Sequence, residues 1–176
     1  CLGASRPIWI AASTHEAEET LALETLQQLK QYYPDCALII APRHAERFDQ
    51  VWQLCQRWPY QVVRRSQQMP DITTDVYLAD TLGELMLLYA AADIAFVGGS
   101  FQTIGGHNPL EPAALSRPII SGPHIFNFQT VYQLLVDANA VCLLQQANQL
   151  VPQLVELWQN PQRQQQLGQN AQQVVI

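Results

Sequence analysis

The sequence of 176 residues has few basic residues, nine lysines and arginines against fifteen aspartates and glutamates. Its formal net charge of −6 excludes a general surface for nucleic acid or for anionic membranes, because both are bound through clustered positive charge. Any anionic ligand must therefore be met by a local site. The length is enough for one full domain and too short for two ordinary ones, and the 48% of hydrophobic residues can supply a sizeable core.

Long apolar runs and paired cysteines are also missing. No apolar run approaches the roughly 20 residues that span a bilayer, and no charged and then apolar leader is present, so the sequence predicts a soluble domain. The four cysteines, Cys1, Cys36, Cys55 and Cys142, show no paired spacing. This pattern favours buried free thiols of a reducing cytoplasm over disulfides or zinc ligands. Because residue 1 is not a methionine, we expect the chain to be a piece of a longer protein.

Short apolar runs alternate along the chain with segments of helical periodicity. In the helical segments, apolar residues recur three or four positions apart, as Val51, Trp52 and Cys55 do. Strands that are buried on both sides and alternate with covering helices indicate an α/β fold, a Rossmann-like doubly wound parallel sheet in a single domain. The pattern predicts seven strands, at residues 8–12, 36–40, 61–64, 76–79, 94–97, 118–121 and 140–143.

The segment from residue 148 onward is rich in glutamine. It contains Pro152 and Pro161, which we interpret as breaks around two solvated terminal helices. Leucines at helical spacings favour packing of these helices onto the domain over a polyglutamine-type interaction segment; they are Leu150, Leu154, Leu157 and Leu167.

The most informative segment follows the predicted strand at residues 94–97. Two glycine pairs, at 98–99 and 105–106, lead into Asn108, which has the side chain of an N-cap, and Pro109, which suits a first helical position. Glu111 follows where a carboxylate favours the positive helix end. Glycines let the backbone approach a ligand, and uncapped N–H groups attract phosphate. The segment predicts an anion site with a carboxylate at its edge. The alternative is that the glycines only form a tight turn and that Asn108 and Glu111 only cap a helix, since these roles require the same residues.

Each of the four histidines follows a predicted strand closely. Because ligands of doubly wound sheets bind beyond the carboxyl ends of the strands, we expect these side chains at one edge of the sheet. No two of them share a short ligand spacing, and no cysteine or carboxylate cluster joins them. Hydrogen bonding to a sugar, to a phosphate or to neighbouring loops is therefore favoured over a metal site for His15, His44, His107 and His124.

Five stretches fall at this edge of the predicted sheet, residues 13–19, 41–48, 80–85, 97–112 and 122–128. Together they closely resemble the C-terminal half of the bacterial 3-deoxy-D-manno-octulosonic acid (Kdo) transferases of lipid A assembly. The resemblance runs from about residue 6 to residue 140. One departure is Ala17, where the family usually carries glycine, and it bears on the tightness of the first turn.

This resemblance implies a GT-B glycosyltransferase of two domains, in which the C-terminal domain binds CMP-Kdo and the N-terminal domain binds lipid A precursor. Residues 1–176 would form one nucleotide-sugar-binding domain, the donor half. The family transfers Kdo with inversion and requires no metal and no cofactor. Its carboxylate base comes from the N-terminal domain, so the catalytic base is expected outside this sequence.

The resemblance also implies that the whole protein works at the cytoplasmic face of the inner membrane of Gram-negative bacteria, in lipopolysaccharide synthesis. Membrane contact is expected only through the N-terminal domain, and no nucleic acid partner is expected.

The expected chemistry requires fixed donors around the phosphate, because the leaving CMP gains negative charge there. The resemblance and this requirement together predict contacts to CMP-Kdo from Thr14, Pro42, Arg43, His44, Leu82, Gly83, Gly105, Gly106, His107, Asn108 and Glu111. Arg43 suits a bidentate contact to phosphate, the alternative being a surface ion pair with a helix carboxylate. Glu111 is expected to accept hydrogen bonds from the ribose hydroxyls, the alternative being a purely capping role.

The remaining predicted roles are local. Ser13 and Glu16 have the spacing of a capping box, which makes Thr14 the expected ligand contact of that stretch. Leu82 and Gly83 are expected at the start of a helix, where they would pack with Pro42 against the cytosine.

Glu84 is expected as a first-turn helix acid, and His124 as a residue that shapes the turn at Gly122 and Pro123.

Two other functions fit the same fold. One is a different GT-B enzyme, such as a UDP-sugar epimerase, and the other is a non-catalytic nucleotide-binding domain. The nucleotide that binds the domain, and transfer by the joined halves, would discriminate among the three.

Overall fold

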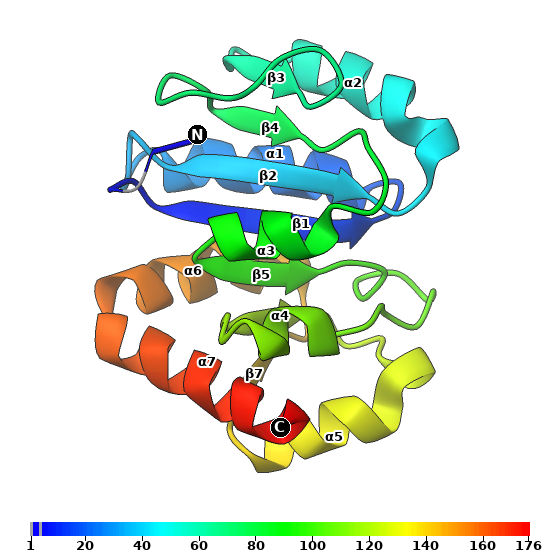
Figure 1. The fold of residues 1–176 in the computed structure, drawn as a ribbon, viewed down its shortest axis with the longest axis vertical. Helices are drawn as coiled ribbons and strands as arrows, with labels where there is room; N and C mark the ends of the chain where they lie inside the picture. Colours follow the sequence, from blue (N-terminus) through cyan, green and yellow to red (C-terminus); the bar gives the residue numbers. More distant parts are fainter. Residues whose placement is uncertain (1, 4) are drawn as a thin grey trace.

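The computed structural model describes residues 2–3 and 5–176 of the chain. Its described residues form one sheet of seven strands in the order β3-β4-β2-β1-β5-β6-β7, and every neighbouring pair is parallel (Figure 1). The strands are β1 (Ile8–Thr14), β2 (Ala37–Pro42), β3 (Val62–Arg64), β4 (Val76–Leu78), β5 (Ile94–Val97), β6 (Ile119–Ser121) and β7 (Val141–Leu143). Each lies within two residues of its predicted bounds, so the doubly wound parallel sheet is confirmed.

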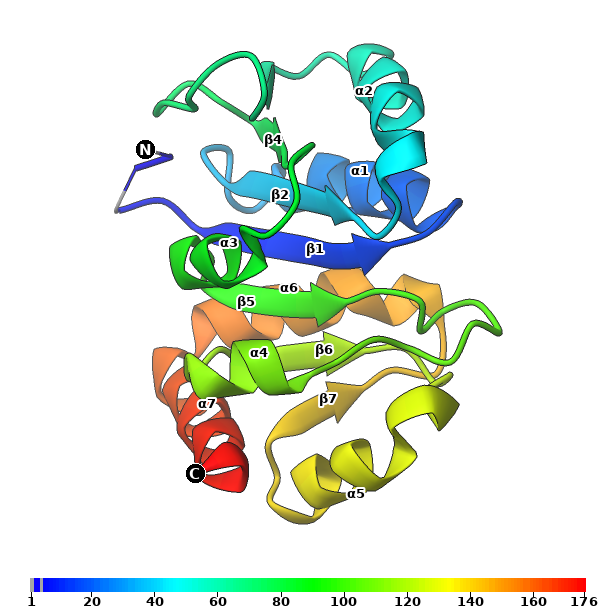
Figure 2. The same ribbon diagram turned by 45° about the vertical axis from the view of Figure 1, so that its right-hand side comes forward.

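Helices cover both faces of the sheet (Figures 1 and 2). One face carries α1 (Glu18–Leu29), α2 (Phe48–Gln56) and α6 (Leu150–Gln159), whose apolar side chains join one core cluster. The other face carries α3 (Leu85–Ala91), α4 (Leu110–Ala114), α5 (Gln129–Asp137) and α7 (Pro161–Val175). Three short 3₁₀ turns, η1 (Ala45–Arg47), η2 (Phe126–Phe128) and η3 (Ala147–Gln149), precede α2, α5 and α6.

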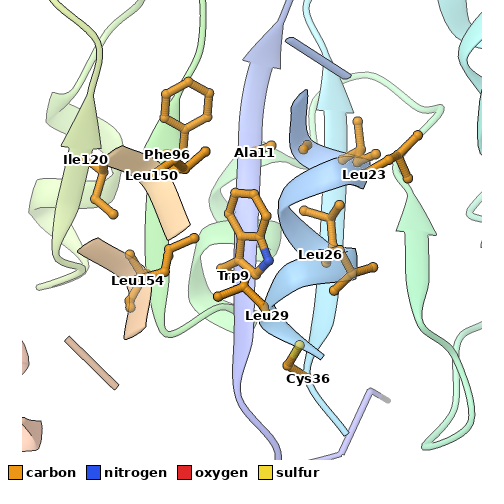
Figure 3. Close-up of a cluster of buried hydrophobic side chains, with 14 of the residues drawn as sticks. Trp9, Ala11, Leu23, Leu26, Leu29, Cys36, Phe96, Ile120, Leu150 and Leu154 are labelled. Carbon is orange, nitrogen blue, oxygen red and sulfur yellow. The ribbon is translucent and has the colours of Figure 1, made fainter. Parts of the chain in front are cut away.

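The centre of the sheet is its most deeply buried part. Trp9 of β1 pairs with Leu38 of β2 and with Ile94 of β5, and its side chain is wholly buried. Figure 3 shows its ring among leucines of α1 and α6. Burial of such side chains contributes about 1.5–3 kcal/mol each, so this layer fixes β1 between its neighbours.

The side of the sheet on which successive strands are added changes between β1 and β5, although all strands stay parallel. From β1 the chain builds β2, β3 and β4 on one side, and β5, β6 and β7 then extend the other side. Loops that follow β1 and β5 therefore diverge at the carboxyl edge and leave a crevice, which is the usual ligand position in such sheets.

The terminal helices differ in one respect from the sequence prediction. Pro161 is the first residue of α7, as expected of a break, but Pro152 lies in the first turn of α6 and does not interrupt it. A first-turn proline is tolerated because its missing N–H would have no partner there in any case. The predicted packing of the leucines on these helices is confirmed, since all of them are buried: Leu150, Leu154, Leu157 and Leu167.

The cysteines of the described residues are free and buried, as predicted for Cys36, Cys55 and Cys142, while Cys1 lies outside the described residues. Burial raises the pKa of the Cys55 thiol to about 12, so it stays protonated at neutral pH. None of the described helices is long and apolar enough to cross a membrane.

Candidate functional site

A pocket of about 320 Å³ opens at the carboxyl edge of the sheet. Its walls come from the segments that follow β1, β2, β4 and β5, which are far apart in sequence and meet at the reversal point. Seven residues predicted to contact the ligand line it: Pro42, Arg43, Leu82, Gly83, His107, Asn108 and Glu111. The structure thus brings together most of the predicted residues, in a crevice of the expected kind.

Two charged side chains in this pocket have no partner within the described part of the chain. Arg43 is exposed, and its guanidinium makes neither an ion pair nor a hydrogen bond there, although its backbone N–H donates to Thr14 O at 2.9 Å. The alternative role of Arg43, a surface ion pair, is therefore not formed. Glu111 is half-buried in the first turn of α4, and its carboxylate accepts no hydrogen bond from the described residues. One positive and one negative group remain available to a ligand.

The first glycine pair of the loop after β5 does not offer its N–H groups to the pocket. Glu18 is only 2% exposed, and its carboxylate accepts hydrogen bonds from the N–H groups of Gly99 at 2.8 Å, Ser100 at 3.2 Å and Phe101 at 3.3 Å. It also accepts the N–H of His15 at 3.0 Å. The anion position formed by these backbone groups is occupied by the protein's own carboxylate.

Glu18 is a residue that sequence reasoning missed. The predicted capping box of Ser13 and Glu16 is wrong, because α1 begins at Glu18 and its N-cap Ala17 has no side-chain cap. The carboxylate that reaches back to the preceding turn is that of Glu18, three residues after His15. That spacing was a usable signal, but its partners at residues 99–101 are set by tertiary structure.

The second glycine pair holds the loop in shape. Gly106 donates its N–H to Gly99 O at 2.9 Å, so the prediction that this N–H serves the ligand is wrong. A Cβ at Gly105 would lie 2.5 Å from Phe126 Cε2, and Asn127 donates from Nδ2 to Ile104 O at 2.8 Å. Gly105 and Gly106 are buried within the loop and do not line the pocket.

The end of the loop after β5 supplies backbone N–H groups that remain available to a ligand. The backbone N–H groups of His107 and Asn108 donate to none of the described residues. The N-cap of α4 is Pro109 and not Asn108 as predicted, because the helix begins at Leu110, one residue later than expected. Asn108 lies just before the N-cap, and its Oδ1 accepts the N–H of Leu110 at 2.9 Å. Because α4 has only five residues, its dipole is small, and individual N–H groups are the donors that matter.

Three of the four histidines gather beside the pocket. His15 and His107 lie with their Nε2 atoms 2.7 Å apart and their rings nearly parallel, at 5°. The ring of His44 lies edge-on to His15, with centroids 5.3 Å apart. His124 makes no ring contact with a described residue; its N–H donates to Ser100 O at 2.9 Å, which ties its turn to the loop after β5.

The histidine pair is neutral at pH 7. Burial, then the neighbouring His15, Arg43 and His44, lower the pKa of His107 to about 4. Burial and the positive groups around it also lower the pKa of His15. Among the described residues, no group of three or more His, Cys, Asp and Glu side chains is placed to hold a metal ion.

Besides Gly105 and Gly106, two further predicted contacts, Thr14 and His44, lie outside the pocket wall. The side chain of Thr14 is fully buried, and Ser13 lines the pocket in its place. The register of β1 shifts between Ala12 and Thr14, and Ser13 has a positive φ of 55°, so the side chains alternate differently at the strand end. His44 is exposed and packs against His15 at the side of the pocket.

The wall after β4 is held by its own polar contacts. Glu84 is the N-cap of α3 and not a first-turn residue as predicted. Its carboxylate accepts a hydrogen bond from Thr81 Oγ1 at 2.7 Å, which lowers the pKa of Glu84, and contacts Arg65 Nε at 3.4 Å. Leu82 is 73% exposed above Gly83, which has a φ of 82°. This turn presents an apolar side chain at the mouth of the pocket.

Comparison with known proteins identifies relatives of this chain. No protein-family model matches the chain. A 3-deoxy-D-manno-octulosonic acid transferase of Haemophilus influenzae is 48% identical over 137 residues, which are 77% of this chain and 32% of that protein. The transferase of Bordetella pertussis is 36% identical over 171 residues, 94% of this chain and 40% of that protein. The chain thus spans between 32% and 40% of the length of these curated relatives.

A solved structure matches over nearly the whole chain. It is the C-terminal CMP-Kdo binding domain of WaaA from Acinetobacter baumannii, 41% identical, with a TM-score of 0.91. The match covers 97% of this chain and 89% of that domain.

Proposed function

Because the chain belongs to the family of Kdo transferases, whose C-terminal domain it matches, we propose that it binds CMP-Kdo and is the donor-binding domain of such an enzyme. One observation carries the proposal. The pocket at the reversal point of the sheet holds a guanidinium, Arg43, and a carboxylate, Glu111, neither of which has a partner among the residues that the structure describes. A nucleotide offers a phosphate to the first and ribose hydroxyls to the second.

The pocket residues divide among the parts of the nucleotide. Arg43 binds the phosphate through charge-assisted hydrogen bonds, together with the N–H groups of His107 and Asn108. Glu111 accepts hydrogen bonds from the ribose. Leu82 and Pro42 pack against the cytosine, and Ser13, in place of Thr14, is the contact from the end of β1.

The donor domain assists the departure of CMP. As the bond from the sugar to the phosphate breaks, negative charge grows on the phosphate, and fixed donors at that position lower the barrier. Inversion, independence of metal and a carboxylate base outside this chain are part of the proposal. So are a lipid A precursor as acceptor and work of the whole enzyme at the inner membrane.

Calorimetry with this chain tests the proposal. CMP should bind, UMP should bind more weakly, and chelation by EDTA should change neither affinity. The chain alone should transfer no Kdo from CMP-Kdo to lipid A precursor. Preference for UDP would favour the epimerase-like alternative, and a full-length protein that binds CMP without transfer would favour a non-catalytic role.

A further inference from the structure

The imidazole rings of His15 and His107 are the part of the site that the proposed function does not use. The two rings come from different loops, after β1 and after β5, and share one hydrogen bond between their Nε2 atoms at 2.7 Å. His107 lines the pocket, whereas His15 does not line it and contacts the ring of His107. A Cβ at Gly99 would lie 2.8 Å from His107 Cδ2, so the glycine makes room for this ring.

The position of His15 is fixed by the buried residue Glu18. Its backbone N–H donates to the buried carboxylate of Glu18, which also holds the N–H groups of the loop after β5. A contact chain therefore runs from Glu18 to His15 to His107 and ends in the pocket. A side chain that is held by packing and hydrogen bonds keeps a neighbouring group in one orientation.

Burial, and then the positive groups around the pair, explain why it is neutral in the free protein. Burial lowers the pKa of both rings most, and Arg43 and His44 near both rings, with Arg47 near His15, disfavour a further positive charge. The carboxylate of Glu18 faces the backbone of His15, while Glu111 and Glu84 lie on other walls of the pocket. A ligand anion beside Arg43 and His107 would act against this balance and raise the pKa of His107 toward neutrality, because a nearby opposite charge favours the charged form, typically by about 1–3 pKa units.

We propose that His15 and His107 act as one unit that takes up a proton when a phosphate group binds in the pocket, with His15 as the positioning residue that holds His107 for this step. The inference rests on the proposed function, since it requires a nucleotide in the pocket.

The proton balance is simple. In the free protein one ring donates its Nε2 hydrogen to the other, and neither is charged. A proton from solvent then adds to a free ring nitrogen, and the charged ring donates to its neutral neighbour, so the hydrogen bond is kept and becomes charge-assisted. The phosphate gains a second positive partner beside Arg43 without movement of the loops.

Nuclear magnetic resonance of histidine-labelled protein tests the uptake directly. Saturating CMP should raise the pKa of His107 from about 4 by about 2–3 units, enough for partial protonation near neutral pH, while cytidine, which lacks the phosphate, should leave it unchanged. A similar shift with cytidine would reject the coupling to phosphate. CMP that binds without moving the His107 titration rejects this inference alone, whereas CMP that fails to bind rejects the proposed function beneath it.

Two variants test the positioning role of His15. His15→Ala should weaken CMP binding about fivefold, the effect of one neutral hydrogen bond, and should change the His107 resonances. His15→Gln keeps a hydrogen-bonding partner and should restore most of the affinity, while the pKa of His107 in the free protein rises because the second ring is gone. If His15→Ala melts like wild type and binds CMP equally well, His15 does not position the pocket.

Discussion

Arg43 and Arg47 lie four positions apart after β2 and differ in whether their guanidinium groups have a partner within the described residues. Arg47 points into the scaffold, where its Nη1 lies 2.5 Å from Oε1 of Glu19, a carboxylate with 1% side-chain exposure. Arg43 stands in the pocket with no partner among the described residues. Charges of the scaffold are neutralised within the protein, and a charge left open in a pocket marks the side that meets a ligand.

The acidic residues repeat the contrast. Glu18 receives four backbone N–H groups and is shut away from solvent, whereas Glu111 is half-buried at the pocket and receives none from the described residues. Closeness to a motif in the sequence therefore does not distinguish residues that contact a ligand from residues that stabilise the loop. The two kinds differ in whether their hydrogen-bonding groups already have partners within the described residues.

The largest effect should come from removing a scaffold charge. Arg47→Met leaves Glu19 buried without its partner, and we expect the free energy of unfolding to fall by about 3 kcal/mol at pH 7. The control Arg57→Met removes a cation that has no partner among the described residues, and it should cost less than about 0.5 kcal/mol. Urea unfolding of both variants gives the comparison.

The cost of Arg47→Met should also depend on pH. Burial raises the pKa of Glu19 above its unfolded value, so its contribution to stability is present below the unfolded pKa and is lost as pH rises through the folded pKa. Without Arg47 the folded pKa rises further. The difference from wild type should therefore shrink from pH 7 to pH 4, and an equal difference at both would contradict a charged Glu19.

Removing the charge of Arg43 should change the affinity for CMP and not the stability of the fold. Arg43→Ala should weaken CMP binding by about 1.5–3 kcal/mol, the range for hydrogen bonds to charged groups, with an unchanged melting temperature. Arg57→Ala, which removes a cation that lies away from this pocket and has no partner within residues 2–3 and 5–176, serves as the matched control and should leave CMP affinity alone. Equal affinities of the two variants would assign Arg43 to the solvated surface.

Substitution of Glu111 should lower CMP affinity less than substitution of Arg43 does. Glu111→Gln should cost about 1 kcal/mol in CMP affinity, because the amide accepts at one atom only and presents an unwanted donor. With 2′-deoxy-CMP the cost should be reduced if the carboxylate binds that hydroxyl. A variant that loses only a few tenths of a kcal/mol in stability and no affinity would leave Glu111 as a cap.

The smallest effect concerns the scaffold turn itself. Ala17 has a φ of 74°, where glycine has no steric cost, so Ala17→Gly should raise the unfolding free energy by about 0.5 kcal/mol. Gln27→Gly, at an exposed helical position of α1, should lower it by up to about 1 kcal/mol. Thermal melts of the pair separate strain at residue 17 from a general effect of glycine.

The sheet could be predicted because its signals are local. Each strand is a short apolar run bounded by polar residues, and even the three-residue β3 was placed correctly. The pocket residues could be predicted because they lie in the segments after those strands: Arg43 follows β2 directly, and His107 lies in the loop after β5. Resemblance to the family added the roles, and the sheet topology then determined which segments meet.

The errors have a common cause, which is that long-range contacts set the details. Ser13 and Thr14 exchange places because of the register shift at the end of β1, which no pattern of residues indicates. The N–H of Gly106 is used by Gly99, seven positions earlier, and Glu16, Glu18 and Glu19 fit short cap spacings equally well. Only the fold selects Glu18, through amides more than 80 residues away.

That last contact has a consequence for how the chain folds. Segments 81 to 83 residues apart must meet before the carboxylate of Glu18 can bind the amides of residues 99–101. Contacts of such separation form slowly, because closing the loop costs entropy that local contacts do not. During refolding, the amides of residues 99–101 should thus become protected from hydrogen exchange late, together with the gain of nucleotide binding.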